Sequence, residues 1–239
     1  LASAWLWDAL HDDPDAPAGL ADDLAENLRA FAKELMKIAP EHNLDLCIRD
    51  ADGRLVHFHD LNAKLLAPDS VIPDGLKFSN GFNAAMSMAI IRAAYHVTGD
   101  EEIGRYYYEE LITNRDYPKA MNETAGVIFL GASTNYSNVN MLAMSLLTIA
   151  RFETDEKVRA TLYDTFDQQF WDTGNDRDVS HVEQAWFDVI YGASSPSAPA
   201  TIPDRVVKNL GGFQPAPAFQ RDRVHCDDAE IAAKLCVAI

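Results

Sequence analysis

The chain has 239 residues, of which 48% are hydrophobic, and a formal net charge of −17 at pH 7. A protein that binds nucleic acid or an anionic membrane surface needs clustered Lys and Arg, and no such cluster is present, so we expect neither partner. No run of about 20 apolar residues occurs, so we expect no membrane span. The acid excess is typical of a solubilising surface rather than of a dedicated cation site. The length permits one or two domains, and we expect a single helical domain over residues 1–239.

The chain ends and the cysteines bear on processing and compartment. The sequence begins at Leu1 rather than at Met, which indicates a removed tag, signal peptide or neighbouring segment. It ends at Ile239 inside apolar sequence, so we expect the natural protein to continue there. Cys226 and Cys236 are close enough for a local disulfide in an exported protein, and buried or free thiols are the alternative. The compartment therefore stays open, with an exported or periplasmic location favoured.

The first part of the chain predicts a short packing arm, one helix and a hairpin. The opening SAWLWDAL indicates a short packing arm, and residues 20–38 place apolar side chains three and four apart, which predicts an amphipathic helix that Pro40 closes. Over about residues 44–58 the period changes to two around an Asp-Gly pair, which predicts one small β-hairpin lying as a lid on a helical body. Residues 62–81 are irregular and contain two prolines, which predicts a surface loop.

Two helical hairpins are predicted next. Residues 82–97 are apolar nearly all round, which predicts a buried inner helix, and a charged helix with one apolar stripe follows as its outer partner. Residues 138–171 show the same order of a buried arm, a short polar break and an outer arm. At an offset of about 56 residues, Met88 falls on Met144 and Ala94 on Ala150, so we interpret the hairpins as copies of one repeat. Generic similarity between helical hairpins is the alternative.

The remaining sequence predicts further helices joined by polar connections. Residues 179–191 indicate a third inner-type helix that carries Trp186, and the small, Pro-rich residues 192–199 indicate an exposed connection. Shorter helices are expected at about residues 204–210 and 227–237.

An inner helix, an outer helix and a long loop, repeated at roughly 50 to 60 residues, resembles the six-hairpin (α/α) toroid proteins. That group includes many glycoside hydrolases, epimerases and polysaccharide lyases. The resemblance rests on residues 82–111 and 138–171 with the inner helix near Trp186, about half the chain, and the runs DADGRLVHFHDLN and TNYSNVNMLAMSLL are similar to segments of bacterial proteins of this type. A closed ring of six hairpins needs a longer chain, so the resemblance implies a mainly α fold of stacked hairpins in a toroid-like arc.

In such layered folds the loops that enter the inner helices converge on one face, where their polar side chains line a cleft. Asn and Tyr side chains offer neutral donors and acceptors that suit sugar hydroxyls, and ordinary helix capping is the alternative role. Trp186 could stack on a sugar ring, although an aromatic residue on an inner helix is typical of a core. The candidate substrate-binding residues are Ser79, Asn80, Asn135, Tyr136, Asn138, Asn140 and Trp186.

Asp60 is the candidate catalytic residue, as a carboxylate expected near that cleft. Glycosidic hydrolysis by the usual route needs two facing carboxylates, and the sequence singles out no pair. His57 and His59 have a spacing that a metal site could use with Asp60, but paired loop histidines are the preferred interpretation, so we expect no metal and no cofactor. The defining residues of serine hydrolases, P-loop nucleotide sites and zinc ribbons are missing.

These observations favour a carbohydrate-related role, in which an oligosaccharide is bound or processed in the cleft at the inner-helix loops. The alternative is a non-catalytic helical scaffold that binds a protein or peptide partner. Whether the protein is an enzyme stays open at the level of the sequence.

Overall fold

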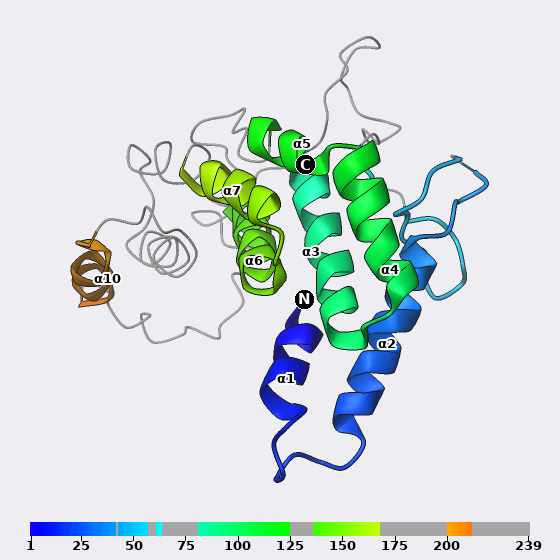
Figure 1. Ribbon diagram of the computed structural model, residues 1–239, viewed down its shortest axis with the longest axis horizontal. Coiled ribbons are helices and arrows are strands. Elements are labelled where there is room, and N and C mark those ends of the chain that lie inside the picture. The colour runs from blue at the N-terminus through cyan, green and yellow to red at the C-terminus, as the bar shows by residue number, and fades with distance from the viewer. Residues whose placement is uncertain (42, 57–60, 64–80, 125–135, 168–199, 212–239) are drawn as a thin grey trace, which may run out of the picture.

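The computed structural model describes residues 1–41, 43–56, 61–63, 81–124, 136–167 and 200–211 (Figure 1). These residues are mainly helical, which confirms the predicted class. Within them, β structure is limited to two isolated antiparallel bridges, Ala39 with Leu44 and Arg49 with Leu55. Among the helices of the described part, none has the length and apolar character needed to cross a membrane.

The N-terminal helices pack against the middle of the molecule. Helix α1 spans Ala2–Leu10, where the sequence indicated a short packing arm, and helix α2 spans Leu20–Leu35, within the amphipathic helix predicted for residues 20–38. Acidic residues in the first turn of α2 and Lys33 in its last turn suit the helix dipole, and its buried face carries Leu28, Ala32 and Leu35. The helix ends before Pro40, and Ile38 beyond it is 64% exposed.

Helices α3 (Gly81–Thr98) and α6 (Tyr136–Phe152) form the centre of the fold. Their small and aliphatic side chains are buried on several faces, as expected for helices that are apolar nearly all round. The two helices pack on each other, and α3 also packs against α1, α2 and α5. Two of the predicted inner helices are therefore the central ones, and the third, at residues 179–191, lies outside the described residues.

Each central helix turns back into a shorter helix. Helix α3 is followed by α4 (Glu101–Arg105), which continues into the π-helix η1 (Tyr106–Asn114), and α6 is followed by α7 (Glu156–Thr165). Asp100 and Asp155 cap α4 and α7, because each carboxylate accepts hydrogen bonds from backbone N–H groups of the first turn. The two turns thus use the same device, and the repeat itself stays a prediction.

The C-terminal ends of helices α3 and α6 meet beside α1. The rings of His96 and Phe152 stack with centroids 4.3 Å apart, and Asp8 of α1 is hydrogen-bonded to both His96 and Arg151. Helix α3 extends away from α1 towards α5 (Figure 1). Helix α5 (Tyr117–Thr124) packs against α3 and α7, and α10 spans Ile202–Gly211.

The segment before α3 differs from its prediction. Gly53, at φ 77°, forms the expected turn by donating its N–H to the carbonyl of Asp50, 3.0 Å away. No strand forms in residues 43–56, because Leu46 adopts φ 58° and interrupts the alternation of an extended run. The predicted β-hairpin is thus present only as a turn with one bridge. Asn62 and Ala63, expected in a surface loop, are buried.

Candidate functional site

The residues singled out in the sequence fall largely outside the described part of the structure. This holds for Asp60 and the two nearby histidines, and for the loop residues Ser79, Asn80, Asn135 and Trp186. Tyr136, Asn138 and Asn140 form the first turns of α6, and their side chains also lie outside the described part. The structure therefore neither joins nor separates the predicted set.

A hollow of about 110 Å³ lies between Ile38, residues 43–45, Asn62 and the C-terminal end of η1. Apolar side chains and planar polar side chains both line it. The residues are Ile38, Asn43, Leu44, Asp45, Asn62, Glu110 and Arg115. This mixture of a few polar groups with apolar surface is typical of small-molecule sites.

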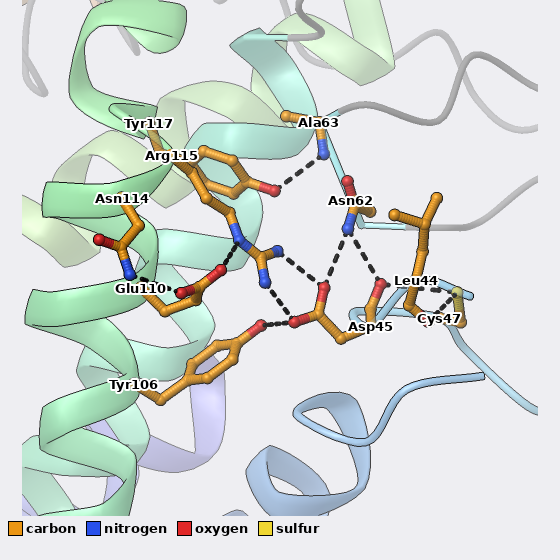
Figure 2. Close-up of polar contacts among 10 residues, drawn as sticks. All are labelled: Leu44, Asp45, Cys47, Asn62, Ala63, Tyr106, Glu110, Asn114, Arg115 and Tyr117. Carbon is orange, nitrogen blue, oxygen red and sulfur yellow. Dashed lines mark hydrogen bonds and ion pairs between the residues drawn. The ribbon is translucent and has the colours of Figure 1, made fainter. Parts of the chain in front are cut away.

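Asp45 is the centre of the polar network beside the hollow (Figure 2). Arg115 donates two parallel hydrogen bonds to its carboxylate, of 2.7 Å to Oδ1 and 2.5 Å to Oδ2. The Tyr106 hydroxyl donates to Oδ2 at 2.7 Å, and Nδ2 of Asn62 donates to Oδ1 at 2.9 Å. The buried carboxylate of Asp45 therefore accepts four hydrogen bonds. These bonds connect residue 45 to Asn62, to Tyr106 of the π-helix and to Arg115 at its end.

The π-helix aligns the residues that hold Arg115. In η1 the hydrogen bonds span five residues, and Arg115 continues this pattern by donating its backbone N–H to the carbonyl of Glu110 at 3.0 Å. The same spacing brings Nε of Arg115 to 2.7 Å from Glu110 Oε1, while Asn114 Nδ2 donates to Oε2 at 2.8 Å. The guanidinium also lies 5.7 Å from the ring centroid of Tyr106. Arg115 is therefore fixed from several sides.

These contacts set the charge of each group. Burial would raise the pKa of Asp45, but the hydrogen bonds from Arg115 and Tyr106 outweigh it and hold the pKa below its ordinary value. Hydrogen bonds from Asn114 and then Arg115 lower the pKa of Glu110. Burial, reinforced by the Asp45 carboxylate, raises the pKa of Tyr106. Near neutral pH both carboxylates are thus ionised and the Tyr106 hydroxyl is a donor.

Asn62, which lines the hollow, contacts the first turn of α3. Asn62 lies two residues after Asp60, and its carbonyl accepts a hydrogen bond of 3.4 Å from Asn83 in the first turn of α3. Ala63 donates its N–H to the hydroxyl of Tyr117 at 3.2 Å. Residues 62 and 63, the first turn of α3 and Tyr117 of α5 are therefore joined by hydrogen bonds next to the hollow.

A second buried carboxylate lies at the turn between α6 and α7. Glu153 accepts hydrogen bonds from the hydroxyls of Tyr107 at 2.6 Å and Tyr108 at 3.1 Å, and from the backbone N–H groups of Thr154 and Asp155, both at 2.7 Å. Burial and the Glu153 charge raise the pKa of Tyr107, so its hydroxyl remains a donor. Nε of Arg92, buried and without a hydrogen-bond partner, lies 3.9 Å from Glu153 Oε2. This network links α3, η1 and α7 inside the protein.

Sequence reasoning missed the residues that define the hollow. Asp45 interrupts an apolar run between Leu44 and Leu46, and a carboxylate in a half-buried segment is a signal for a buried partner. Nothing in the sequence identifies that partner as Arg115, which lies 70 residues away.

Comparison of the chain with protein-family models, with curated proteins and with solved structures gives no match. Across the described residues, no three His, Cys, Asp or Glu side chains are grouped so that they could hold a metal ion. The chemistry of the hollow is thus the basis for a functional proposal.

Proposed function

We propose that the protein binds one end of a hydroxyl-rich ligand, a mono- or oligosaccharide, in the hollow beside Asp45. The observation that carries this proposal is the lining itself, which combines planar carboxylate, amide and guanidinium groups with the apolar side chains of Ile38 and Leu44. A sugar ring has hydroxyls along its edge and C–H groups on its faces, so it needs both kinds of surface.

The lining residues divide into those that face a ligand and those that support them. Asp45 already accepts four hydrogen bonds, and its side chain is 7% exposed, so it acts as a support. Glu110, with a side chain 36% exposed, and the exposed Asn43 present polar atoms at the rim. Ile38 offers the apolar surface. We therefore assign ligand contact to Glu110, Asn43 and Ile38.

The size of the hollow limits what it holds. Pockets that enclose a small molecule have volumes of about 300 to 1,000 Å³, well above the volume of this hollow. A ligand would thus place one end in the hollow and extend along the surface. In the proposed site the loop residues Ser79, Asn80 and Asn135, with the first turns of α6, continue the binding surface.

The toroid-like arc is part of the same proposal. Two buried central helices that pack on each other, each followed by a helix with an Asp N-cap, support this arrangement. In such an arc the ends of the inner helices that carry the first turns form the binding face.

Binding is favoured over hydrolysis at the hollow. A glycosidase needs one carboxylic acid that stays protonated, which requires a raised pKa. The pKa values of Asp45 and Glu110 are both lowered, so neither residue is suited to be the acid. Asp60 remains the proposed catalytic residue if the ligand is also processed.

A binding assay with matched variants tests the proposal. Neutral mono- and disaccharides should raise the melting temperature of the full chain, because a ligand that binds only the folded state stabilises it. Ile38→Ser should weaken binding about tenfold, equivalent to about 1.4 kcal/mol. Phe31→Ser, which changes another exposed apolar residue of the same region but not the hollow, should leave binding unchanged.

Two outcomes would contradict the proposal. If no saccharide shifts the melting temperature, the scaffold alternative is favoured and a search for a protein partner follows. If Phe31→Ser and Ile38→Ser weaken binding equally, the ligand lies elsewhere on the surface.

A loop variant tests the extended part of the site. If this loop serves only to bind the ligand, Asn135→Ala should abolish or weaken saccharide binding while the free energy of unfolding changes by less than about 0.5 kcal/mol. A large loss of stability with binding retained would assign a structural role to this loop.

A further inference from the structure

We infer that the hollow selects its ligand by charge, taking neutral saccharides and, more tightly, amino sugars, and rejecting uronic acids and other anionic sugars. This inference rests on the proposed saccharide function and adds the class of sugar. It follows from which charges line the hollow and which of them a ligand can reach.

Arg115, the cationic residue of the hollow, is already paired with the carboxylates of Asp45 and Glu110. Arg115 directs both terminal nitrogens to Asp45 and Nε to Glu110, and its side chain is 13% exposed. A guanidinium that binds an incoming carboxylate needs a pair of N–H groups pointing at it. Because the N–H groups of Arg115 already donate to Asp45 and Glu110, Arg115 is not suited to bind an anionic ligand.

The accessible charge is negative. Asp45, Glu110 and Arg115 together carry a net charge of −1, since two carboxylates face one guanidinium. Glu110 is the most exposed of the three side chains. Each of its oxygens accepts one hydrogen bond, from Arg115 or Asn114, and a carboxylate oxygen can accept a second.

An ammonium group suits this position better than a hydroxyl. The ammonium of an amino sugar offers three donors and a positive charge, and charge-assisted hydrogen bonds to carboxylate are stronger than neutral ones. A uronate would instead bring a carboxylate next to Glu110, and like charges repel at this distance. The acidic character of the whole chain acts in the same direction over longer range.

Three forms of one sugar ring test the inference directly. The neutral, 2-amino and uronate forms of glucose and of galactose are titrated into the full chain by calorimetry at low salt. We expect the amino form to bind at least about tenfold more tightly than the uronate, and this ratio should fall as salt is added.

Two substitutions assign the selection to the hollow. Glu110→Gln keeps the shape of the side chain and removes its charge, so the ratio between amino sugar and uronate should fall towards one. Glu109→Gln makes the same change in net charge at the neighbouring exposed residue, which does not line the hollow, and should leave the ratio unchanged. Asn43→Asp adds a carboxylate at the rim and should increase the ratio, since Asp also tolerates the φ of 53° found there.

The outcomes separate this inference from the function on which it rests. Equal affinities for the three forms, or equal effects of Glu109→Gln and Glu110→Gln, would overturn charge selection by the hollow while leaving saccharide binding in place. Absence of binding by all three forms of both sugars would overturn the saccharide proposal and the inference with it.

Discussion

Asp45 and Glu153 are two buried carboxylates, each near one Arg, and they are stabilised in different ways. Asp45 forms a short, two-bonded ion pair with Arg115 at the floor of a hollow. Glu153 lies fully inside the protein, with two tyrosine hydroxyls and two backbone N–H groups as donors, while Arg92 stays 3.9 Å away. One network is built on opposite charges and the other on neutral donors.

The comparison shows how one helix serves two purposes. Tyr106 of η1 faces Asp45, whereas Tyr107 and Tyr108 face Glu153. Consecutive tyrosines therefore connect the rim of the hollow to the interior. The Asp45 network positions the polar groups that line the hollow. The Glu153 network connects the helices that carry those groups.

Removal of the internal carboxylate should have the largest effect. Glu153→Leu leaves Arg92 buried without an opposite charge and removes the acceptor of four donors, so we expect a loss of about 3 to 5 kcal/mol in the free energy of unfolding. Urea denaturation measures this loss. Glu153→Gln, which retains the shape of the side chain and one acceptor oxygen, should lower the free energy of unfolding by less. A loss below about 1 kcal/mol for Glu153→Leu would show that this network does not stabilise the fold.

Removal of the carboxylate at the hollow should cost less, because its surroundings are partly open to water. For Asp45→Ala we expect a loss of about 2 to 3 kcal/mol, since Arg115 can regain some hydration and keeps its bond to Glu110. The same urea experiment compares the two variants. A greater loss for Asp45→Ala than for Glu153→Leu would reverse the proposed order of the two networks.

The Asp45 network should also give the protein a defined sensitivity to acid. The pKa of Asp45 is lowered from 3.8 in the folded state, so its stabilising effect is complete above that value and is lost as the pH falls through the folded pKa. The difference in melting temperature between the wild type and Asp45→Asn should therefore shrink between about pH 5 and about pH 2. A difference that stays constant over this range would contradict the assignment of the charge.

The hydroxyl of Tyr106 should contribute less to the free energy of unfolding than either carboxylate. Tyr106→Phe removes one donor from Asp45 while the ring stays in place, and we expect a loss of about 1 to 2 kcal/mol. Tyr163→Phe is the control, because its hydroxyl accepts a hydrogen bond from Arg159 within one turn of α7 and should be worth about 0.5 kcal/mol or less. Thermal unfolding measures both losses of stability. Equal losses for Tyr106→Phe and Tyr163→Phe would show that the hydrogen bond to Asp45 has no special weight.

The smallest effect is expected at the turn that Glu153 holds. Asp155→Ala removes the side-chain cap of α7 but keeps the backbone N–H that donates to Glu153, so the loss should be about 1 kcal/mol. Circular dichroism during urea titration measures it. A loss comparable to that of Glu153→Leu would show that the cap, rather than the buried carboxylate, maintains the turn.

The helices could be predicted because local spacing determines them. The pattern from Leu20 onward, with acids first and Lys late, gave the helix that the structure shows, and the two apolar segments gave α3 and α6 within a few residues. The hairpin was only partly predicted, since the turn at Gly53 follows from local chemistry but the left-handed conformation of Leu46 does not.

The candidate site could not be predicted in the same way. The contact between Asp45 and Arg115 depends on how η1 packs against the segment before α3, and no spacing rule covers residues so far apart. The predicted set at Asp60, Asn80 and Asn135 is untested by the structure. Asn62, which accepts a hydrogen bond from Asn83 beside the hollow, was predicted to lie in a surface loop and not in a site.

The π-helix makes the hollow dependent on chain length rather than only on side-chain identity. Each of its hydrogen bonds closes a ring one residue larger than in an α-helix, and such a segment arises when a residue is inserted into an α-helix. Deletion of exposed Thr113 would let η1 return towards α-helical winding and rotate Glu110 relative to Arg115. A variant shortened by this one residue would therefore retain every lining residue of the hollow but would no longer hold Glu110 and Arg115 in the same arrangement.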